Sequence, residues 1–453
     1  MLYAGTASAV ITPGNGTTPT YLDGIGDAKT RLAGSTLDEL RVRVVWLERD
    51  GKNLIIINAD LLYIPFRLYE EMRKWLRDEL RLRNGCLIFN ATHTHSAPCL
   101  GQTESEEQQA PYGDYLKKRT KQALKDAFSS MEPCRLFLGK TICTIGTNRR
   151  RKIIRTEQLK ALRLGRAFAN RPNPFAVTDP ELIVLKIWKG GRWDVCIVNY
   201  ACHPSILRGC LISADFPGRV ADWIGNRLGR HITVLFLQGF GGNIRPNLLG
   251  PKPSLRTNPK EWIVERIEGR RFKKDGSEQD IVSIGAAIGK SILAIREEDY
   301  REIDVHLSWK EKTIDLPLKR ALVESKSPCA TVSPDRRLPG SSVGTGEGSP
   351  GDRVVPITIQ RVDLSREVSF LCVPGEVFCE YSLSLKKILH SREIIALGCT
   401  NGMVGYIPTD EAIREGGYET ARAYRFYGQA DPFSEGIERA FSDGVRSLFE
   451  IPG

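Results

Sequence analysis

The sequence contains neither of the segments that carry a chain to or across a membrane. Its first basic residue is Lys29, so the positively charged start of a secretory signal is missing. The most apolar stretch, residues 54–66, is interrupted by Asn58 and Asp60 and is shorter than the roughly 18 residues that a membrane-spanning helix needs. We therefore expect a cytoplasmic protein without a membrane span.

Cysteine pairs with the C-x-x-C spacing are also missing, although the chain has 11 cysteines. This absence argues against a structural zinc site made of thiolates. Cys196, Cys202, Cys372 and Cys379 lie in or beside apolar segments, as small buried hydrophobic residues do. The odd number of cysteines in so long a chain fits reduced thiols, which agrees with a cytoplasmic location.

Aromatic residues are scarce, at 8%, and positive charge is concentrated in short segments. The chain has 65 basic and 54 acidic residues, a net charge of +11, and residues 149–171 alone contain nine Lys or Arg and one Glu. Residues 251–275 form a second basic segment. Such segments either lie in solvent or attract an anionic substrate or nucleic acid. Because no aromatic stacking motif accompanies them, nucleic acid is the weaker of the two binding hypotheses.

Short apolar segments alternate with amphipathic helices along the chain. Residues 54–57 form a predicted strand, residues 65–82 a helix with one apolar face, and residues 86–89 the next strand. This alternation predicts an α/β protein with a layered mixed β-sheet flanked by helices. We expect one domain over residues 1–453, with a flexible loop rich in Pro, Gly and Ser at 326–352. Further predicted strands are 182–187, 195–200, 232–237, 368–373 and 394–397, and further predicted helices are 216–228 and 377–389.

Histidine is rare, and three of the six histidines follow predicted strands. His93 and His95 come after the strand at 86–89, and His203 comes after the strand at 195–200. In open α/β sheets, ligands collect beyond the carboxyl ends of strands, and alternate residues of an extended segment share one face. The imidazoles can therefore converge on one metal ion, and imidazole suits zinc.

Two oxygen ligands in similar positions would complete a zinc site that leaves one position for water. Glu376 follows the strand at 368–373 in a Pro-Gly turn, and Tyr406 lies beyond the strand at 394–397 in a Gly-rich segment. Another Gly-rich turn covers residues 239–242, where the missing side chains let the backbone approach a metal cavity or a substrate closely.

In this order, the motifs resemble those of the neutral/alkaline non-lysosomal ceramidases, zinc amidases that cleave the N-acyl bond of ceramide. The resemblance spans nearly the whole chain and implies the fold of the ceramidase catalytic domain. It depends on Thr92–Ser96, Asn148-Arg149, Thr178–Lys186, the strand that ends at His203, Gly242–Asn247, Pro374–Glu376, and Tyr406 followed by Tyr418.

The resemblance also implies a role for individual residues. The zinc ligands of the family fall on His93, His203, Glu376 and Tyr406. Its outer-sphere and oxyanion-binding groups fall on His95, Arg149 and Tyr418. The expected substrate contacts are Arg149 and the turn residues Gly241, Gly242 and Asn243.

Two differences from the family concern the substrate and the mechanism. Ceramide-cleaving members carry Gly-Asp-Val-Ser-Pro-Asn at residues 242–247, so Arg245 replaces a serine and Asn243 replaces an aspartate that could act as a base. The chain also ends, at Gly453, before the β-sandwich that follows the catalytic domain in full-length members. We therefore expect a smaller or more polar substrate than ceramide.

The sequence thus predicts a zinc-dependent hydrolase that uses metal-activated water on a linear C–N amide bond of a small N-acyl substrate. The basic residues next to Arg149 indicate an anionic partner, and the family indicates a lipid-like one. The alternatives at the same site are an N-acylsphingosine amidase (ceramidase) proper and acyl transfer or lactam formation. The alternatives from other classes are a basic nucleic-acid-binding protein and a metal-free scaffold. The sequence leaves the oligomeric state open.

Overall fold

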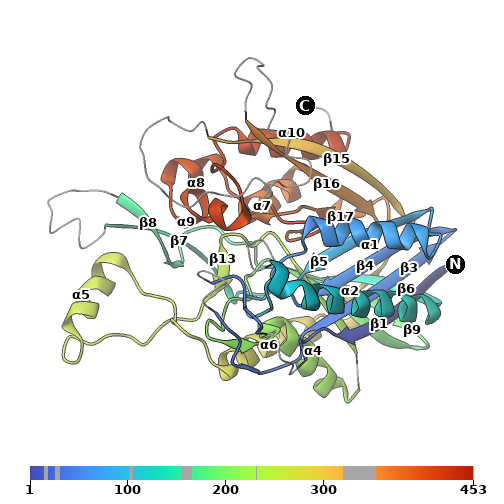
Figure 1. Cartoon of the computed structure of the whole chain (residues 1–453), viewed down its shortest axis with the longest axis horizontal. Coiled ribbons are helices and arrows are strands. Elements are labelled where there is room, and N and C mark those ends of the chain that lie inside the picture. The colour runs from blue at the N-terminus through green and yellow to red at the C-terminus, as the bar shows by residue number, and fades with distance from the viewer. Residues whose placement is uncertain are drawn as a thin grey trace.

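A computed structural model of the chain has an α/β fold with a large mixed sheet, a smaller sheet and helices on the outside (Figure 1). The structure describes residues 1–14, 19–25, 31–100, 106–154, 166–230, 232–319 and 353–451. The predicted fold class is confirmed, and the loop predicted at 326–352 lies outside the described residues. Within the described ranges, every helix is too short or too polar to span a lipid bilayer.

The large sheet has nine strands among the described residues, in the order β12-β10-β9-β6-β1-β3-β4-β5, with β14 beside β6. Two neighbouring pairs are parallel, β4 with β5 and β10 with β12. Each parallel pair is joined through a helix, α1 (Phe66–Asp78) or α4 (Asp215–Leu228), as a parallel connection requires. The strands are β1 (Leu2–Val10), β3 (Arg41–Arg49), β4 (Lys52–Ala59), β5 (Gly85–Ala91), β6 (Glu132–Ile142), β9 (Glu181–Lys189), β10 (Arg192–Tyr200), β12 (Thr233–Gln238) and β14 (Arg301–Glu302).

The strand, helix and strand predicted over residues 54–89 are β4, α1 and β5. Leu68, Met72 and Leu76 of α1 are buried in one cluster with residues of the sheet, as three-to-four spacing of apolar residues predicts. The helix ends before the predicted boundary because the chain turns at Arg81, where φ is 54°.

Two polar residues inside the apolar strands β4 and β5 fasten distant parts of the sheet together. The side chain of Asn58 donates to the carbonyl of Phe236 (2.8 Å) and accepts from its amide (3.2 Å). The side chain of Asn90 accepts from the amide of Gln238 (3.1 Å). β12, at one edge of the sheet order, is thereby tied to β4 and β5 at the other edge. Both asparagines are fully buried, where an unbonded amide would be costly.

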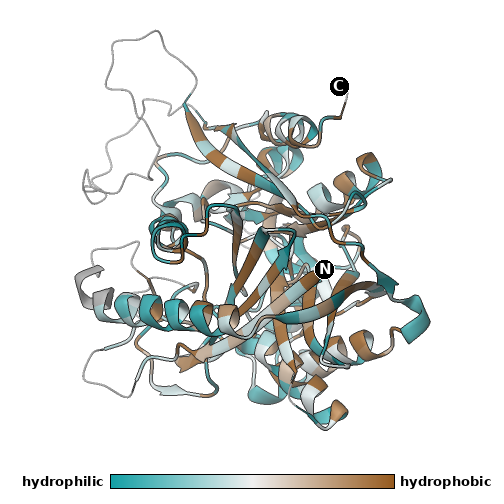
Figure 2. Cartoon of the chain, turned by 90° about the vertical axis from the view of Figure 1, so that its right-hand side faces the viewer, coloured by the Kyte–Doolittle hydropathy of each residue, from teal (hydrophilic) through white to brown (hydrophobic). Residues whose placement is uncertain are grey.

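The smaller sheet, β15-β16-β17-β19, shares a buried core with the large sheet. Val362, Phe370 and Ile395 of this sheet pack in one cluster with residues of β3, β4, β9 and β10. Figure 2 shows hydrophobic residues along these central strands and hydrophilic residues on the outer helices. The strands are β15 (Ser308–Pro317), β16 (Val354–Asp363), β17 (Val368–Cys372) and β19 (Glu393–Leu397). The outer helices are α2 (Glu106–Ser129), α6 (Glu278–Leu293), α7 (Cys379–Ile388) and α10 (Ile437–Leu448), besides α1 and α4.

Smaller sheets and a short helix carry four of the predicted site residues, Arg149, Glu376, Tyr406 and Tyr418. They include the antiparallel sheet of β13 (Ile244–Pro246), β7 (Gly146–Ile154) and β8 (Arg166–Asn173), and the parallel pairs of β18 (Glu376–Val377) with β20 (Tyr406–Ile407) and of β2 (Ser35–Thr36) with β11 (Leu211–Ile212). The remaining helices are α5 (Pro259–Glu268), α8 (Asp410–Glu415) and α9 (Tyr418–Ala421), with 3₁₀ turns η2 (Glu297–Asp299) and η3 (Ala423–Tyr427).

Candidate active site

His93 and His95 follow β5, and backbone hydrogen bonds fix the segment that carries them. The amides of Thr92 and His93 donate to the carbonyls of Ala59 and Leu61, at the end of β4 and just beyond it (2.8 and 2.9 Å). His93 has a φ of 68°, a left-handed conformation that these bonds hold in place. The two imidazoles do come together, with ring centroids 4.9 Å apart. They do so through this turn, and the strand alternation that we expected to align them stops at Ala91.

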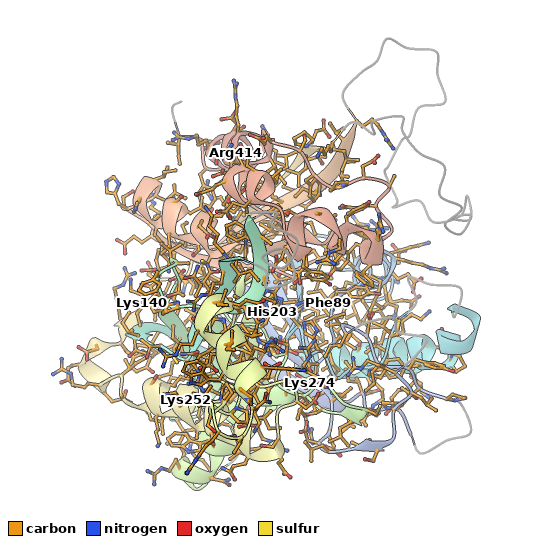
Figure 3. The ribbon with its side chains drawn as sticks, turned by 90° about the vertical axis from the view of Figure 1, so that its left-hand side faces the viewer. Phe89, Lys140, His203, Lys252, Lys274 and Arg414 are labelled. Atoms are coloured by element: carbon orange, nitrogen blue, oxygen red, sulfur yellow. The ribbon has the colours of Figure 1, made fainter. Side chains whose placement is uncertain are left out.

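His203 follows β10 and lies near the middle of the molecule (Figure 3). Its Nδ1 atom contacts the carbonyl oxygens of Gly241 and Ile244 (2.7 and 3.0 Å). In the same way, Nδ1 of His93 contacts the carbonyl oxygen of Leu62 (2.6 Å). A carbonyl oxygen can only accept, so the Nδ1 atoms carry the protons and donate. In the neutral rings, the Nε2 atoms are therefore unprotonated.

These Nε2 atoms of His93 and His203 face one carboxylate oxygen, Oε2 of Glu376, at 3.2 and 2.8 Å. If the imidazoles are neutral, each contact places two hydrogen-bond acceptors, an unprotonated nitrogen and a carboxylate oxygen, next to each other with no proton between them. Burial and the positive charge of Arg149 lower the pKa of His203 to about 4, so a proton does not resolve its contact at neutral pH. Burial alone would lower the pKa of His93, but Cys399 and Glu376 raise it well above its ordinary value, so a proton on Nε2 can resolve that contact. A cation bound among these atoms resolves both contacts.

His95 brings a third nitrogen to the same place. Its Nδ1 donates to the carbonyl of Gly24 (2.8 Å), and its buried Nε2 has no hydrogen-bond partner among the described residues. The candidate ligand nitrogens of His93, His95 and His203 lie within 4.8 Å of one another. Burial and the neighbouring His93 hold the pKa of His95 well below its ordinary value, which leaves the Nε2 lone pair free. An orphaned buried nitrogen at this point fits a metal ion, so His95 is as well placed to ligate as the residues that the resemblance implies.

Glu376 is the carboxylate of the cluster, and its two oxygens have different partners. β18 pairs with β20, which sets Glu376 beside Tyr406 in the backbone register. The hydroxyl of Tyr427 donates to Oε1 of Glu376, while Oε2 faces the histidines. Burial alone would raise the pKa of Glu376, but the positive charge of His93 in its protonated form and the contacts with His203 and His93 hold it well below its usual range. The carboxylate is therefore charged at neutral pH. Tyr427 was not predicted from the sequence.

Tyr406 and Arg149 form the next layer of the site. The guanidinium of Arg149 donates to the Tyr406 hydroxyl (2.9 Å) and to Glu419 (3.0 Å), and Glu419 also accepts from Arg150 (2.9 Å). The ring of Tyr406 lies nearly parallel to that of His203, with centroids 6.4 Å apart. Burial raises the pKa of Tyr406 well above its ordinary value and Arg149 opposes this rise. A phenolate ligand at Tyr406 would therefore depend on Arg149 and on a bound cation.

The turn residues Gly241, Gly242 and Asn243 lie behind the histidines and outside the cavity wall. The carbonyl of Gly241 holds His203, and a side chain on Gly242 would meet the carbonyl oxygen of Glu376 at 2.4 Å. Asn243 is fully buried between the carboxylate of Glu380 (2.8 Å) and the amide of Cys379 (3.0 Å). Their position supports the candidate ligands and does not support the predicted substrate contacts.

A cavity of about 460 Å³ is lined by four of the predicted site residues, His95, Arg149, Tyr406 and Tyr418. His93, His203 and Glu376 are almost fully buried and lie deeper. Phe168, Phe426 and Tyr427 add aromatic surface to the wall. Tyr418 is 38% exposed, and burial together with the charge of Glu376 raises its pKa to about 12, so it keeps its proton at neutral pH. We call this space the site cavity.

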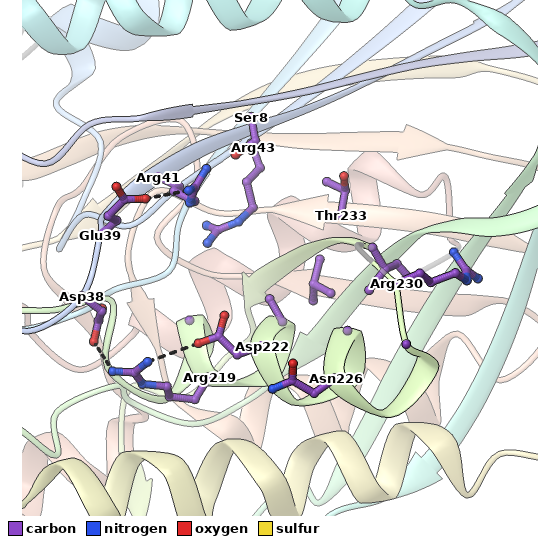
Figure 4. A pocket seen from close by; sticks show the side chains of 16 residues that line it. Ser8, Asp38, Glu39, Arg41, Arg43, Arg219, Asp222, Asn226, Arg230 and Thr233 are labelled. Atoms are coloured by element: carbon purple, nitrogen blue, oxygen red, sulfur yellow. Dashed lines mark hydrogen bonds and ion pairs between the residues drawn. The ribbon is translucent and has the colours of Figure 1, made fainter.

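A second cavity, of about 550 Å³, lies between β3 and α4 (Figure 4). Its wall contains charges of both signs that pair with each other, Arg41 with Glu39 (2.6 Å) and Arg219 with Asp38 (3.0 Å). None of the predicted site residues lines it. We call it the β3–α4 cavity.

The fold of the chain is similar to that of two solved ceramidase structures. The neutral ceramidase of Pseudomonas aeruginosa superposes with a TM-score of 0.69 at 18% identity, and the match covers 100% of this chain and 75% of that one. A ceramidase complexed with C2 gives a TM-score of 0.70 at 17% identity, covering 100% and 76%. No family pattern and no curated protein sequence matches the chain. At such low identity the likeness concerns the fold, and in fold the predicted resemblance is confirmed.

Proposed function

We propose that the protein is a metal-dependent hydrolase of a linear C–N amide bond in a small N-acyl compound. One observation carries the proposal: three imidazole nitrogens and one carboxylate oxygen, all of them possible metal ligands, are buried close together. This mixture of nitrogen and oxygen suits zinc. His93, His203 and Glu376 would hold the ion, joined by Tyr406 as the resemblance implies or by His95 as its position suggests. When bound, zinc lowers the pKa of water to about 7 and polarises a carbonyl group.

Arg149 and Tyr418 have the hydrogen-bond donors that amide hydrolysis requires. Both line the site cavity, where the carbonyl oxygen of a substrate gains negative charge as water adds to its carbon. A preorganised donor to such an oxygen contributes about 3 kcal/mol to catalysis. Tyr418 can also pass its proton to the nitrogen that leaves when the C–N bond breaks. Asn243 takes no part as a base, because its amide is bonded to Glu380 and Cys379.

The test is elemental analysis of the purified protein together with turnover of short N-acyl amines. We expect about one zinc ion per chain, loss of turnover on chelation and recovery on adding zinc back. A protein that hydrolyses amides at full rate without any metal would contradict the proposal.

Ceramide remains the second candidate substrate, because the fold and the aromatic wall of the site cavity suit a lipid-like amide. A fluorescent ceramide assayed beside short polar amides separates the two. Acyl transfer and lactam formation would use the same site and would appear as products with an amine acceptor. The nucleic-acid hypothesis has less support, because three of the nine basic residues in 149–171 are paired inside the protein: Arg149 and Arg150 with Glu419, and Arg171 with Glu268.

A further inference from the structure

Arg245 brings a positive charge into the site cavity, and no carboxylate among the described residues pairs with it. It lies on β13, is only 7% exposed and lines the cavity. One guanidinium nitrogen donates to the carbonyl of Ser205 at the long distance of 3.3 Å, and the buried Nε atom has no partner among the described residues. The guanidinium also lies over the ring of Phe272, 4.3 Å from its centroid.

A buried arginine without such partners lowers the stability of the folded protein when no ligand is bound, since a buried charge needs an opposite charge or strong hydrogen bonds. Burial and the charges of Arg208 and Arg149 lower the pKa of Arg245 to about 9. Asp215 lies near, but backbone amides of Ile206 and Phe216 occupy its oxygens (2.9 and 2.7 Å). The guanidinium therefore has donors to spare and favours an added anion.

The charge of the site cavity is strongly one-sided. Among the described residues, five arginines line it (Arg149, Arg150, Arg208, Arg245 and Arg422) and the one acid of the wall is Glu419. Glu419 is shared by Arg149 and Arg150, which leaves the other three unbalanced. Arg208 is exposed, and its charge acts on both Arg245 and Tyr418. A wall of this kind attracts anions.

Arg245 is also joined to the histidine cluster through the backbone. The preceding residue, Ile244, accepts from the amide of His203 (3.1 Å) and from its Nδ1 (3.0 Å), and Ser205, which accepts from Arg245, follows two residues after His203. A molecule bound to Arg245 therefore lies in the same cavity as the candidate metal ligand His95, next to the aromatic residues of the wall.

We propose that Arg245, assisted by Arg208, binds an oxyanion of the substrate, so that the protein acts on an amide whose small amine part carries a carboxylate or phosphate-type group and whose acyl part is apolar. This inference rests on the proposed amide hydrolysis. Arginine suits both anions because its planar fork matches their oxygens.

The experiment compares three amides with the same acyl chain: N-octanoylglycine, N-octanoylaminomethylphosphonate and the neutral N-octanoylglycinamide. We expect kcat/KM of the wild-type protein to be about 10- to 100-fold higher for one or both anionic amides than for the neutral one, the value of a charge-assisted contact. The better of the two anions identifies the group. In Arg245→Gln the ratio should fall toward one, and in Arg245→Lys it should be intermediate. Arg83→Gln, at an exposed position, is the matched control and should keep the wild-type ratio.

A binding measurement separates this inference from the proposed function. Ketone analogues, in which a methylene replaces the amide nitrogen, cannot be hydrolysed, and calorimetry gives their affinity for the wild-type protein. Tighter binding of the acidic analogue than of its neutral counterpart, lost in Arg245→Gln, supports the anion site even if no amide is turned over. Equal affinity, or a preference for the neutral analogue, overturns it, whether or not the amides are hydrolysed.

Discussion

The β3–α4 cavity and the site cavity differ in how their charges are satisfied. In the β3–α4 cavity, Arg43 forms a buried pair with Asp60 (2.9 Å), and Arg41 and Arg219 also have acidic partners, although one nitrogen each of Arg219 and Arg230 has no hydrogen-bond partner among the described residues. In the site cavity, Arg245 has no such partner among the described residues, and the Nε2 of His95 has none either. Because buried polar groups are normally paired, an unpaired arginine and an unpaired imidazole in one cavity together favour a ligand there. Both cavities are charged and both have unpaired arginine nitrogens, but among the described residues only the site cavity also has an unpaired imidazole nitrogen, the Nε2 of His95.

The largest effect on activity is expected from the removal of a candidate metal ligand in the site cavity. His203→Ala takes away one of the two imidazoles that face Glu376, so we expect the metal content and the turnover both to fall to background. The measurements are elemental analysis and amide hydrolysis. His306→Ala, at an exposed histidine, is the control and should change neither. Retention of metal and turnover in His203→Ala would remove this residue from the site.

A substitution in the β3–α4 cavity should instead act on stability. Arg43→Met leaves the fully buried Asp60 without its cation, and we expect the free energy of unfolding in urea to fall by about 3–5 kcal/mol. Arg41→Met, which breaks the more exposed pair with Glu39, should cost less than about 1 kcal/mol. Both variants should keep kcat per folded molecule, since neither residue contacts the site cavity.

The deficit of Arg43→Met should shrink as the pH is lowered. Burial already raises the pKa of Asp60 in the wild-type protein, and without Arg43 it rises further. A carboxyl with a raised pKa in the folded state binds more protons there than in the unfolded chain, so the folded state gains stability as the pH falls. The difference between variant and wild type should therefore be larger at about pH 7 than at about pH 5. A difference that is equal at the two pH values would mean that Asp60 is not the source of the deficit.

Arg149→Lys tests the paired arginine of the site cavity. Lysine keeps the charge but cannot bridge Tyr406 and Glu419 with a planar fork, so we expect kcat to fall about 100-fold while the protein stays folded. Arg151→Lys is the control, since the Arg151 side chain contacts the carbonyl of Pro172 (3.3 Å), outside the site. A full kcat in Arg149→Lys would exclude its predicted role as an oxyanion donor.

The elements that could be predicted from the sequence have local patterns. β10, α4 and β12 lie where the apolar segments 195–200, 216–228 and 232–237 indicate. α6 was missed, because its glycines count against a helix in the sequence. In the structure, a side chain on Gly289 would collide with the ring of Trp223 at 2.4 Å, so the glycines allow α6 to pack closely on α4.

Some residues of the candidate site could likewise be predicted from local sequence patterns, and others could not. His203 and Glu376 could be predicted because each follows an apolar strand. Tyr427 and Glu419 could not, since their contacts with Glu376 and Arg149 join segments far apart in the chain. From the sequence, Arg245 was interpreted only as the replacement of a serine in the family motif. That its charge has no partner can be seen only in the structure, where its neighbours are known.

The smallest effect is expected for Arg208, an exposed arginine that lines the site cavity together with Arg245. Exposed charges contribute less than about 1 kcal/mol, so Arg208→Gln should raise KM for the preferred anionic amide only about two- to five-fold. Because salt screens exposed charges far more than buried ones, this difference should vanish at about 1 M salt, where the screening length is about 3 Å. The larger effect of Arg245→Gln should persist there. If Arg208→Gln is as damaging as Arg245→Gln and its effect survives high salt, the anion is held at the rim of the site cavity and not at the buried guanidinium.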